Sequence, residues 1–213
     1  MRVTEQTKLR TRERILGAAR KLFDDKGFER ATTRDITLEA GIATGTLFNY
    51  FPSKEGLALT ILGEAVEYAE AEFQAKRWGG ESLAELLFAL TASVLRCLSP
   101  YRRFASQVIE TQPPRPSSMP NDLAGADEAL RDYMERVSEL IARHGPNGGQ
   151  PPTVITLHLY WTLLLGVLSY WADDPSPQQE DTLVLLDQSL RMFVHSLSEQ
   201  NHRTELPDES DHL

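Results

Sequence analysis

Apolar residues recur three or four positions apart along nearly the whole chain, and no long segment alternates apolar and polar residues as a strand does. This pattern predicts an all-α fold of about nine helices. The first predicted helix spans residues 11–26 and stops at Gly27. Residues 32–54 then hold a short helix, a glycine turn, a second short helix and a proline stop.

The segment 32–54 has the layout of a helix-turn-helix, the DNA-reading motif. We expect Thr33 to cap the first of its two helices, and Gly41 allows the sharp turn between them. The residues that fix the two helices against each other are apolar: Ile36, Ala40, Ile42, Leu47 and Phe51. The polar side of the second helix is therefore expected to face outward.

Longer helices follow this motif. Ser53 can cap a helix running to about residue 76, and the apolar spacing predicts further helices at about 83–98, 101–111, 130–141, 153–172 and 177–199. We expect three parts. They are a three-helix DNA-binding domain at 1–53, a helical ligand-binding and dimerisation domain at 54–200, and a disordered tail at 201–213, which has little apolar content.

Charge is distributed unevenly between these parts. The formal net charge is -9, yet residues 1–54 carry +4 and the remaining residues carry -13. A cationic module on an acidic body suits a protein that contacts phosphates with one end only. A solvated N-terminal helix with a chance cluster of arginines is the alternative.

Two features bear on the compartment. The first ten residues lead into no apolar run of a secretory signal, and the single Cys97 excludes an internal disulfide, so we expect a cytoplasmic protein. Residues 154–171 lack formal charge and approach the length of a membrane span. His158 and three hydroxyl side chains interrupt that run, so we expect a buried core helix and no membrane contact.

The stretch AGIATGTLFNYFPSKEGL, preceded by RERILGAARKLFDDKGFERATTRDI, resembles the signature of the TetR family of bacterial transcriptional regulators. The resemblance covers residues 11 to about 60, and the rest of the chain shares only the all-helical plan and the length. It implies a homodimeric repressor that releases double-stranded operator DNA when a small-molecule effector enters the C-terminal domain.

The resemblance also assigns DNA contacts. It places Thr33 and Arg34 at the phosphates and the groove edge, and Lys54 at the position of the family's phosphate-binding lysine. The matching positions of the second helix of the motif are Thr44, Gly45, Thr46, Phe48, Asn49 and Tyr50. Their chemistry agrees, because an asparagine amide can pair with an adenine edge and hydroxyls can bind phosphate.

Two positions depart from the family pattern. Phe48 stands where a tyrosine is common, so apolar contact, as with a thymine methyl group, replaces a hydroxyl contact. Ala43 stands where a capping serine is common, which weakens the start of the helix unless Thr44 takes the cap.

A dimer contact is expected in the last helix and the helix before it. The last helix has a 3-4-3-4 seam formed by Leu183, Leu186, Leu190, Phe193 and Leu197. The preceding helix has a stripe of small residues, Thr162, Gly166 and Ser169. Packing within one chain is the alternative for the seam. Two DNA-reading domains in one dimer would contact half-sites about 34 Å or more apart, which predicts an inverted-repeat operator.

An effector pocket is expected in the C-terminal part. The residues that could line an apolar cavity with a few polar anchors are Phe88, Phe104, Gln107, Tyr133, Met134, His158 and Trp161. Ordinary core packing is the alternative for most of them.

Other classes of protein find little support. The sequence has no nucleophile elbow, no His-Glu-x-x-His motif, no phosphate loop and no cluster of cysteine and histidine, so we expect no enzyme, no cofactor and no metal site. A nonspecific architectural DNA-binding protein conflicts with the acidic body. An all-helical small-molecule binding protein or enzyme is the remaining alternative.

Overall fold

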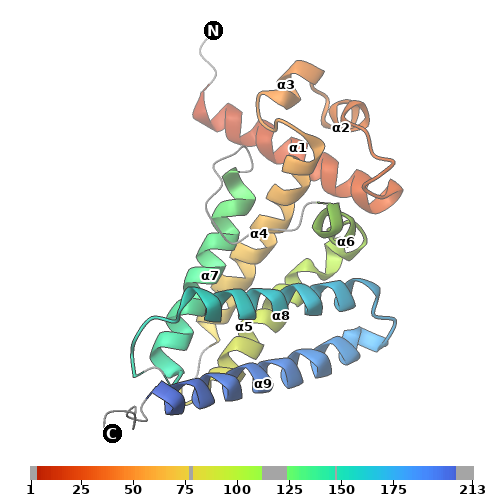
Figure 1. Cartoon of the computed structure of the whole chain (residues 1–213). Coiled ribbons are helices and arrows are strands. Elements are labelled where there is room, and N and C mark those ends of the chain that lie inside the picture. The colour runs from red at the N-terminus through yellow and green to blue at the C-terminus, as the bar shows by residue number, and fades with distance from the viewer. Residues whose placement is uncertain (1–3, 77–78, 112–123, 147, 205–213) are drawn as a thin grey trace, which may run out of the picture. The chain divides into compact units, whose positions relative to one another are not determined.

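The computed structural model describes residues 4–76, 79–111, 124–146 and 148–204, and every regular element in these ranges is helical (Figure 1). The α-helices in these ranges are α1 (Glu5–Lys26), α2 (Thr33–Ala40), α3 (Thr44–Phe48), α4 (Lys54–Ala75), α5 (Leu83–Leu98), α6 (Arg102–Thr111), α7 (Ala124–His144), α8 (Val154–Asp173) and α9 (Glu180–Thr204). Short 3-10 helices, η1 (Ser99–Tyr101) and η2 (Pro177–Gln179), precede α6 and α9. The predicted all-α fold is confirmed.

Internal contacts divide the chain into two compact units. Unit 1 comprises Met1–Tyr68 and Arg96–Arg131, and unit 2 comprises Ala69–Leu95 and Asp132–Leu213. Unit 1 contains the whole helix-turn-helix. Unit 2 contains α8 and α9. The predicted domain boundary between residues 53 and 54 stays a prediction.

Helix α1 is longer than the apolar pattern predicts. It begins at Glu5 because the hydroxyl of Thr4 accepts a hydrogen bond from the backbone N–H of Thr7 at 3.3 Å and so caps the first turn. It ends at Gly27, whose φ of 81° suits glycine, as predicted. The buried face of α1 consists of Ile15, Leu16, Ala18, Ala19, Leu22 and Phe23.

The helix-turn-helix forms where the sequence predicts it, with one shift at its start. The cap of α2 is Thr32, so the prediction that Thr33 caps this helix is wrong by one residue. Asp35 explains the shift, because its carboxylate accepts from the N–H of Thr32 while the Thr32 hydroxyl accepts from the N–H of Asp35, which completes a capping box. The carboxylate of Asp35 accepts hydrogen bonds from the backbone N–H and from the hydroxyl of Thr32, and these two bonds lower the pKa of Asp35. Gly41 turns the chain in the left-handed conformation, with φ 62° and ψ 44°.

Helices α3 and α4 follow the turn closely. Helix α3 begins after Ala43 without a side-chain cap, and Thr44 does not take that role. Helix α4 is capped as predicted, because the Ser53 hydroxyl accepts from the N–H of Gly56 at 3.0 Å.

In unit 2, α8 and α9 run side by side in opposite directions (Figure 1). The corner between them is fixed by Asp174, which is 2% exposed. Its carboxylate accepts from the N–H of Ser176 at 2.8 Å and from the N–H and hydroxyl of Thr182 at 2.9 and 2.5 Å. Burial alone raises the pKa of Asp174, but these hydrogen bonds outweigh it and hold the pKa well below its ordinary value.

Helix α9 continues to Thr204, so the first four residues of the predicted tail are helical. The sequence places no glycine or proline after Pro177 until Pro207, and nothing stops the helix earlier. Residues 205–213, the rest of the predicted tail, lie outside the described residues.

Two stretches of the described chain are long and apolar enough to cross a membrane by length and composition alone, 83–105 and 154–173. Within an apolar window of 18 residues in each stretch, 50% of the first and 39% of the second are buried inside the fold. A core helix of a folded protein has the same length and composition, so these stretches are weak evidence for a membrane span.

Candidate nucleic-acid interface

The second helix of the motif, α3, is held from inside unit 1 and exposed on its other side. Leu47 and Phe51 are buried, at 2% and 5% exposure. Phe48, by contrast, is 47% exposed. Among the other predicted contact positions, Thr44, Gly45 and Asn49 are exposed, and Thr46 and Tyr50 are half-buried. The structure thus brings all six positions to the accessible side of one short segment.

The predicted DNA-contact positions lie within residues 44–50, called the contact segment below. Helix α3 ends at Phe48, so this segment is partly helix and partly turn. Asn49 caps the C-terminal end of α3, and its N–H donates to the carbonyl of Thr46 at 3.2 Å. The N–H groups of Tyr50 and Phe51 both donate to the carbonyl of Leu47, each at 2.9 Å. These bonds keep Asn49 and Tyr50 next to the helix although neither belongs to it.

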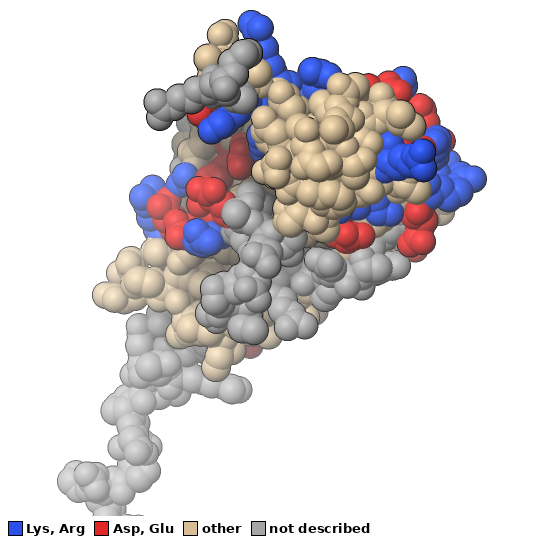
Figure 2. All heavy atoms as spheres, turned by 90° about the horizontal axis from the view of Figure 1, so that it is seen from above, with Lys and Arg blue, Asp and Glu red and all other residues tan. Residues whose placement is uncertain are grey.

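The face around α3 carries no charged side chain. Residues 40–53, from the end of α2 to the start of α4, contain no Asp, Glu, Lys or Arg. Figure 2 shows a broad area of uncharged residues with Lys and Arg side chains at its margins. Any cation that contacts DNA beside α3 therefore comes from a neighbouring element of unit 1.

Most of these neighbouring cations have partners within the chain. On α1, Lys26 lies 3.4 Å from the carboxylate of Asp35, and Lys21 lies 2.6 Å from that of Glu39, so both pair with α2. Arg30 donates from Nε to the carbonyl of Lys26 at 2.8 Å. These contacts orient α2 on α1 at the start of the motif.

Arg14 on α1 reaches the turn of the motif itself. Its Nη2 donates to the carbonyl of Ala40 and, at 3.2 Å, to the carbonyl of Gly41. Both carbonyls lie at the C-terminal end of α2, where helix carbonyls lack partners and favour a cation. Arg14 therefore acts as a positioning residue that fixes the turn between α2 and α3.

Two further arginines of α1 share one carboxylate. Arg12 donates from Nη1 to Glu64 of α4 at 2.8 Å, and Arg20 donates to the second oxygen of the same group. The guanidinium of Arg12 also lies 5.8 Å from the centre of the Phe51 ring. The two arginines join α1 to α4 within unit 1.

Lys54, the predicted phosphate-binding lysine, is half-buried at the start of α4. Its Nζ donates to the carbonyl of Phe28 at 2.8 Å and lies 4.2 Å from the centre of that ring. A contact between Lys54 and a phosphate stays a prediction. It requires the ammonium group to use its remaining N–H bonds or to leave Phe28.

Two cations of the N-terminal part differ from the rest. Among the Lys and Arg of residues 4–54, Arg10 and Arg34 have no side-chain hydrogen bond or ion pair within the described part of the chain. Arg34 is exposed in the first turn of α2, next to Thr33, which is half-buried. The sequence count of charges could not show which cations remain available, because their partners lie on other helices.

Unit 2 has an outward face on α8 that is largely apolar. Val154 and Ile155 are each 71% exposed and Leu159 is 46% exposed, while the predicted small-residue stripe of Thr162, Gly166 and Ser169 is exposed as well. A Cβ atom added at Gly166 would have no neighbouring heavy atom within 4 Å. The predicted stripe is therefore accessible to a partner.

The predicted seam on α9, unlike the stripe on α8, is largely buried. Leu186, Leu190, Phe193 and Leu197 are 0–6% exposed, so they belong to the core of the chain and are not available to a partner. Leu183 is half-buried. The 3-4-3-4 spacing marks a helix that packs on a neighbour, and here that neighbour includes α8 of the same chain. The side of α9 that faces away from the core contains Val184 and Met192, which are 55% and 74% exposed.

A closed group of hydroxyls lies inside unit 2, where α5, α7 and α8 meet. The distances between hydroxyl oxygens are 2.6 Å for Tyr133 and Tyr160, 3.1 Å for Thr91 and Tyr133, and 3.0 Å for Thr91 and Tyr160. Each of the three hydroxyls can donate one hydrogen bond and accept one within the cluster, so each has hydrogen-bond partners although all three are buried. Burial raises the pKa of both tyrosines, which keeps them neutral. Thr91 and Tyr160 were missed as polar groups of this interior because each lies within an apolar run.

The predicted pocket residues divide between different surroundings. Tyr133, Met134 and Trp161 are buried in unit 2, and Phe88 is half-buried there. Phe104 belongs to unit 1, where its ring centre lies 5.1 Å from that of Phe23. The side chain of Gln107 lies outside the described residues.

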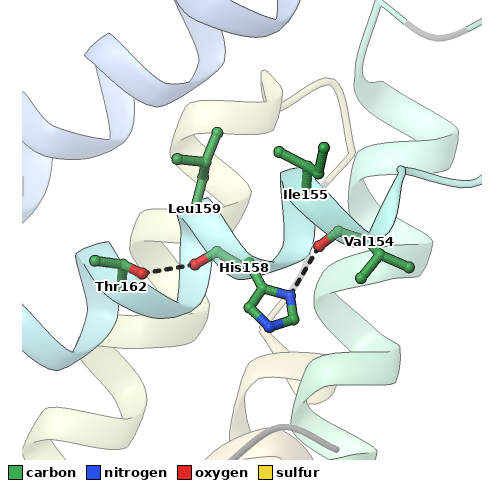
Figure 3. A pocket seen from close by; sticks show the side chains of 5 residues that line it. All are labelled: Val154, Ile155, His158, Leu159 and Thr162. Carbon is green, nitrogen blue, oxygen red and sulfur yellow. Dashed lines mark hydrogen bonds between the residues drawn. The ribbon is translucent and has the colours of Figure 1, made fainter.

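His158, the predicted polar anchor, faces outward. It is exposed, and its Nδ1 lies 3.0 Å from the carbonyl of Val154 (Figure 3). With Val154, Ile155, Leu159 and Thr162 it lines an open depression on α8 (Figure 3). His158 is exposed and Trp161 is 5% exposed, so the prediction that both lie on the same side of this helix is wrong, while a ligand contact of His158 stays a prediction.

Together, the capped α2, the glycine turn and the exposed α3 define an all-helical protein with an N-terminal helix-turn-helix. Residues 15–61 match the model of "Bacterial regulatory proteins, tetR family", and residues 86–209 match that of the "Tetracyclin repressor-like, C-terminal domain". The second match alone covers more than half of the chain. The chain belongs to the TetR family.

Named relatives resemble the N-terminal part. The HTH-type transcriptional regulator UidR of Escherichia coli K12 is 42% identical over 64 residues, which are 30% of this chain and 33% of UidR. The HTH-type transcriptional repressor KstR2 of Mycolicibacterium smegmatis is 33% identical over 63 residues, 30% of this chain and 31% of KstR2. The similarity thus spans about a third of the length of these relatives.

Solved structures resemble the chain over nearly its whole length. The Thermus thermophilus repressor FadR, solved with lauroyl-CoA, has a TM-score of 0.65 at 22% identity and covers 95% of this chain and 98% of its own. FadR of Bacillus halodurans has a TM-score of 0.61 at 19% identity, with 88% and 96% covered. At these identities the likeness shows the fold alone.

Proposed function

We propose that this protein is a cytoplasmic, dimeric transcriptional repressor that binds an inverted-repeat DNA operator and releases it when a small, largely apolar ligand binds. The observation that carries the proposal is the contact segment around α3. Its outward positions are accessible, and its inward residues Leu47 and Phe51 are buried. Membership of the TetR family supports the same function.

Dimerisation is supported by the outward face of α8. Aliphatic side chains with 46–71% exposure beside an accessible small-residue stripe form a surface that gains from burial. A second copy of the chain is the partner we propose for it. The revised dimer surface keeps Thr162, Gly166 and Ser169 and excludes the buried leucines of α9.

The ligand is proposed to bind in unit 2. Its interior is apolar apart from a few groups such as the Thr91, Tyr133 and Tyr160 hydroxyls, which supports a largely apolar effector with few polar atoms. Two FadR proteins of the same fold were solved with lauroyl-CoA and stearoyl-CoA, which makes fatty acyl-CoA a reasonable first probe. Loss of operator binding on its addition, with no loss on addition of coenzyme A alone, would support an acyl chain as the effector.

A footprint of the purified full chain on the DNA beside its own gene tests the DNA-binding function. We expect protection of an inverted repeat with half-sites about 34 Å or more apart, and loss of protection when the repeat is scrambled. Equal protection of scrambled DNA would instead indicate a nonspecific architectural protein.

Two substitutions test the contact segment. Lys54→Ala is expected to weaken binding to all sequences, because a phosphate contact does not depend on the base. Asn49→Ala is expected to cost about 1–3 kcal/mol and to relax the preference at one base pair per half-site. Because Lys54 also contacts Phe28, the thermal unfolding of Lys54→Ala must be measured beside its DNA binding. Unchanged operator affinity in both variants would show that α3 is not the reading helix.

A further inference from the structure

The chemistry of the face around α3 limits which bases it can recognise. In the major groove, guanine is read by Arg or Lys, cytosine by Asp or Glu, adenine by Asn or Gln, and the thymine methyl group by apolar side chains. Residues 40–53 offer none of the four charged types. On this face the exposed amide of Asn49 selects adenine, and the exposed apolar groups, of which the ring of Phe48 is the largest, contact the thymine methyl group.

The hydroxyls on the same face add little discrimination. Thr44, Thr46 and Tyr50 can donate to or accept from many base edges and phosphates, so they position the segment without selecting a base pair. The two discriminating groups favour the two bases of the same pair, adenine and thymine.

Cations near this face are committed to other contacts. Arg14 donates to the carbonyls at the turn, Lys21 pairs with Glu39, and Lys54 donates to Phe28. Arg34, exposed in the first turn of α2, and Arg10, exposed on α1, have no such partner within the described residues, and of the two only Arg34 belongs to the helix-turn-helix. A guanine can therefore be read from α2, at a position separate from α3.

We propose that the base pairs facing α3 in each operator half-site are A·T pairs, with adenine recognised by Asn49 and thymine by Phe48, and that any G·C pair read by the protein faces Arg34. This inference rests on the proposed operator binding. It specifies the class of DNA sequence that the same surface selects.

The test begins with selection of the full chain against random double-stranded DNA. The selected half-site is then altered one atom group at a time. Uracil in place of thymine removes the 5-methyl group, and 7-deazaadenine in place of adenine removes the N7 acceptor while base pairing is kept. Affinity is measured by fluorescence anisotropy at one fixed salt concentration.

Each altered base is expected to affect the wild-type protein and not its matched variant. Replacement of one thymine by uracil should weaken wild-type binding about fourfold, which is the contribution of one buried methyl group. The same replacement should have no effect on binding by Phe48→Ala. 7-Deazaadenine should weaken wild-type binding about 5- to 150-fold and should have no effect on Asn49→Ala.

Two control variants keep the result specific. Phe48→Leu retains an apolar side chain and should keep its response to uracil. Arg34→Ala should keep both responses and lose only a preference at a G·C pair. The three substituted positions, Arg34, Phe48 and Asn49, are exposed, so far-UV circular dichroism of the variants should match that of the wild type.

The outcomes separate the inference from the proposed function. Selection of a half-site with G·C pairs opposite α3, or binding that ignores both altered bases, overturns the inference and leaves operator binding in place. Responses that persist in Phe48→Ala and Asn49→Ala also overturn it. Failure to enrich any sequence overturns the proposed function itself.

Discussion

The face around α3 in unit 1 and the outward face of α8 in unit 2 both lack charge, but they present different atoms. The first offers hydroxyls, an amide and one exposed ring, Phe48. The second offers the aliphatic side chains Val154, Ile155 and Leu159 beside Gly166. The first can exchange hydrogen bonds with base edges, whereas the aliphatic side chains of the second gain by leaving water. Lack of charge alone therefore does not identify the partner of a surface.

The largest effect is expected from a bulky charge on the α8 face. Gly166→Arg fits the single chain, because the position is exposed and a Cβ atom added there has no neighbouring heavy atom within 4 Å, but at the proposed interface the arginine should obstruct a second copy. We expect monomers in sedimentation and a loss of operator affinity of about 10²–10⁴-fold, because two linked half-site contacts become independent.

Gly17→Arg is the matched control for this substitution. Gly17 is also an exposed helical glycine with open space around it, but it lies on α1. The Gly17→Arg substitution should therefore leave the dimer intact. A Gly166→Arg protein that remains dimeric would exclude α8 as the interface.

The next largest effect separates the two sides of α9. Leu190→Ala removes a side chain that is 1% exposed and should cost about 2–5 kcal/mol in the free energy of unfolding. Met192→Ala removes one that is 74% exposed and should cost little. Urea unfolding followed by circular dichroism in the monomeric Gly166→Arg background measures both without a contribution from dimerisation. Equal losses would contradict the assignment of the seam to the core.

A smaller effect is expected at the turn that supports α3. Arg14→Met removes hydrogen bonds to the carbonyls of Ala40 and Gly41 and should lower the free energy of unfolding by about 1 kcal/mol. Arg10→Met changes the same residue type on the same helix, where no partner is present within the described residues, and should have no effect. A similar loss in both variants would show that the effect comes from charge and not from the contacts of Arg14.

The smallest effect concerns the corner between α8 and α9 and depends on pH. The pKa of Asp174 is lowered in the folded state, so the stabilisation by its carboxylate is fully present above the unfolded pKa of about 3.9 and is lost as the pH falls through the folded value. Asp174→Asn should lower the melting temperature at pH 7, and the difference from wild type should shrink at acidic pH. A difference that stays constant between pH 7 and pH 3 would mean that the charge of Asp174 contributes nothing.

Features of the fold that depend on neighbouring residues were predictable from the sequence. Gly27 ends α1, Gly41 makes the turn and Ser53 caps α4, because each acts on backbone groups within a few positions. The start of α2 was predicted one residue late, although Asp35 three positions after Thr32 is a local signal for the cap.

Features that depend on distant residues were not predictable. The spacing of the leucines in α9 shows that one side packs, but not that its partner belongs to the same chain. The cations of α1 are counted easily, yet Arg12 and Arg20 meet Glu64 across 52 and 44 residues of sequence. The cluster of hydrogen-bonded hydroxyls from Thr91, Tyr133 and Tyr160 likewise forms only when three helices meet.

The commitment of most N-terminal cations to partners within the chain has a consequence for binding in the cell. Each cation that neutralises a phosphate releases condensed counterions from the duplex, and this release makes binding weaken as salt rises. A cation already paired with Glu39 or Glu64 releases fewer of them. A rise in salt concentration should then weaken the proposed DNA binding less than the +4 charge of residues 1–54 suggests, and the proposed contacts of Asn49 and Phe48 should carry a larger share of the affinity.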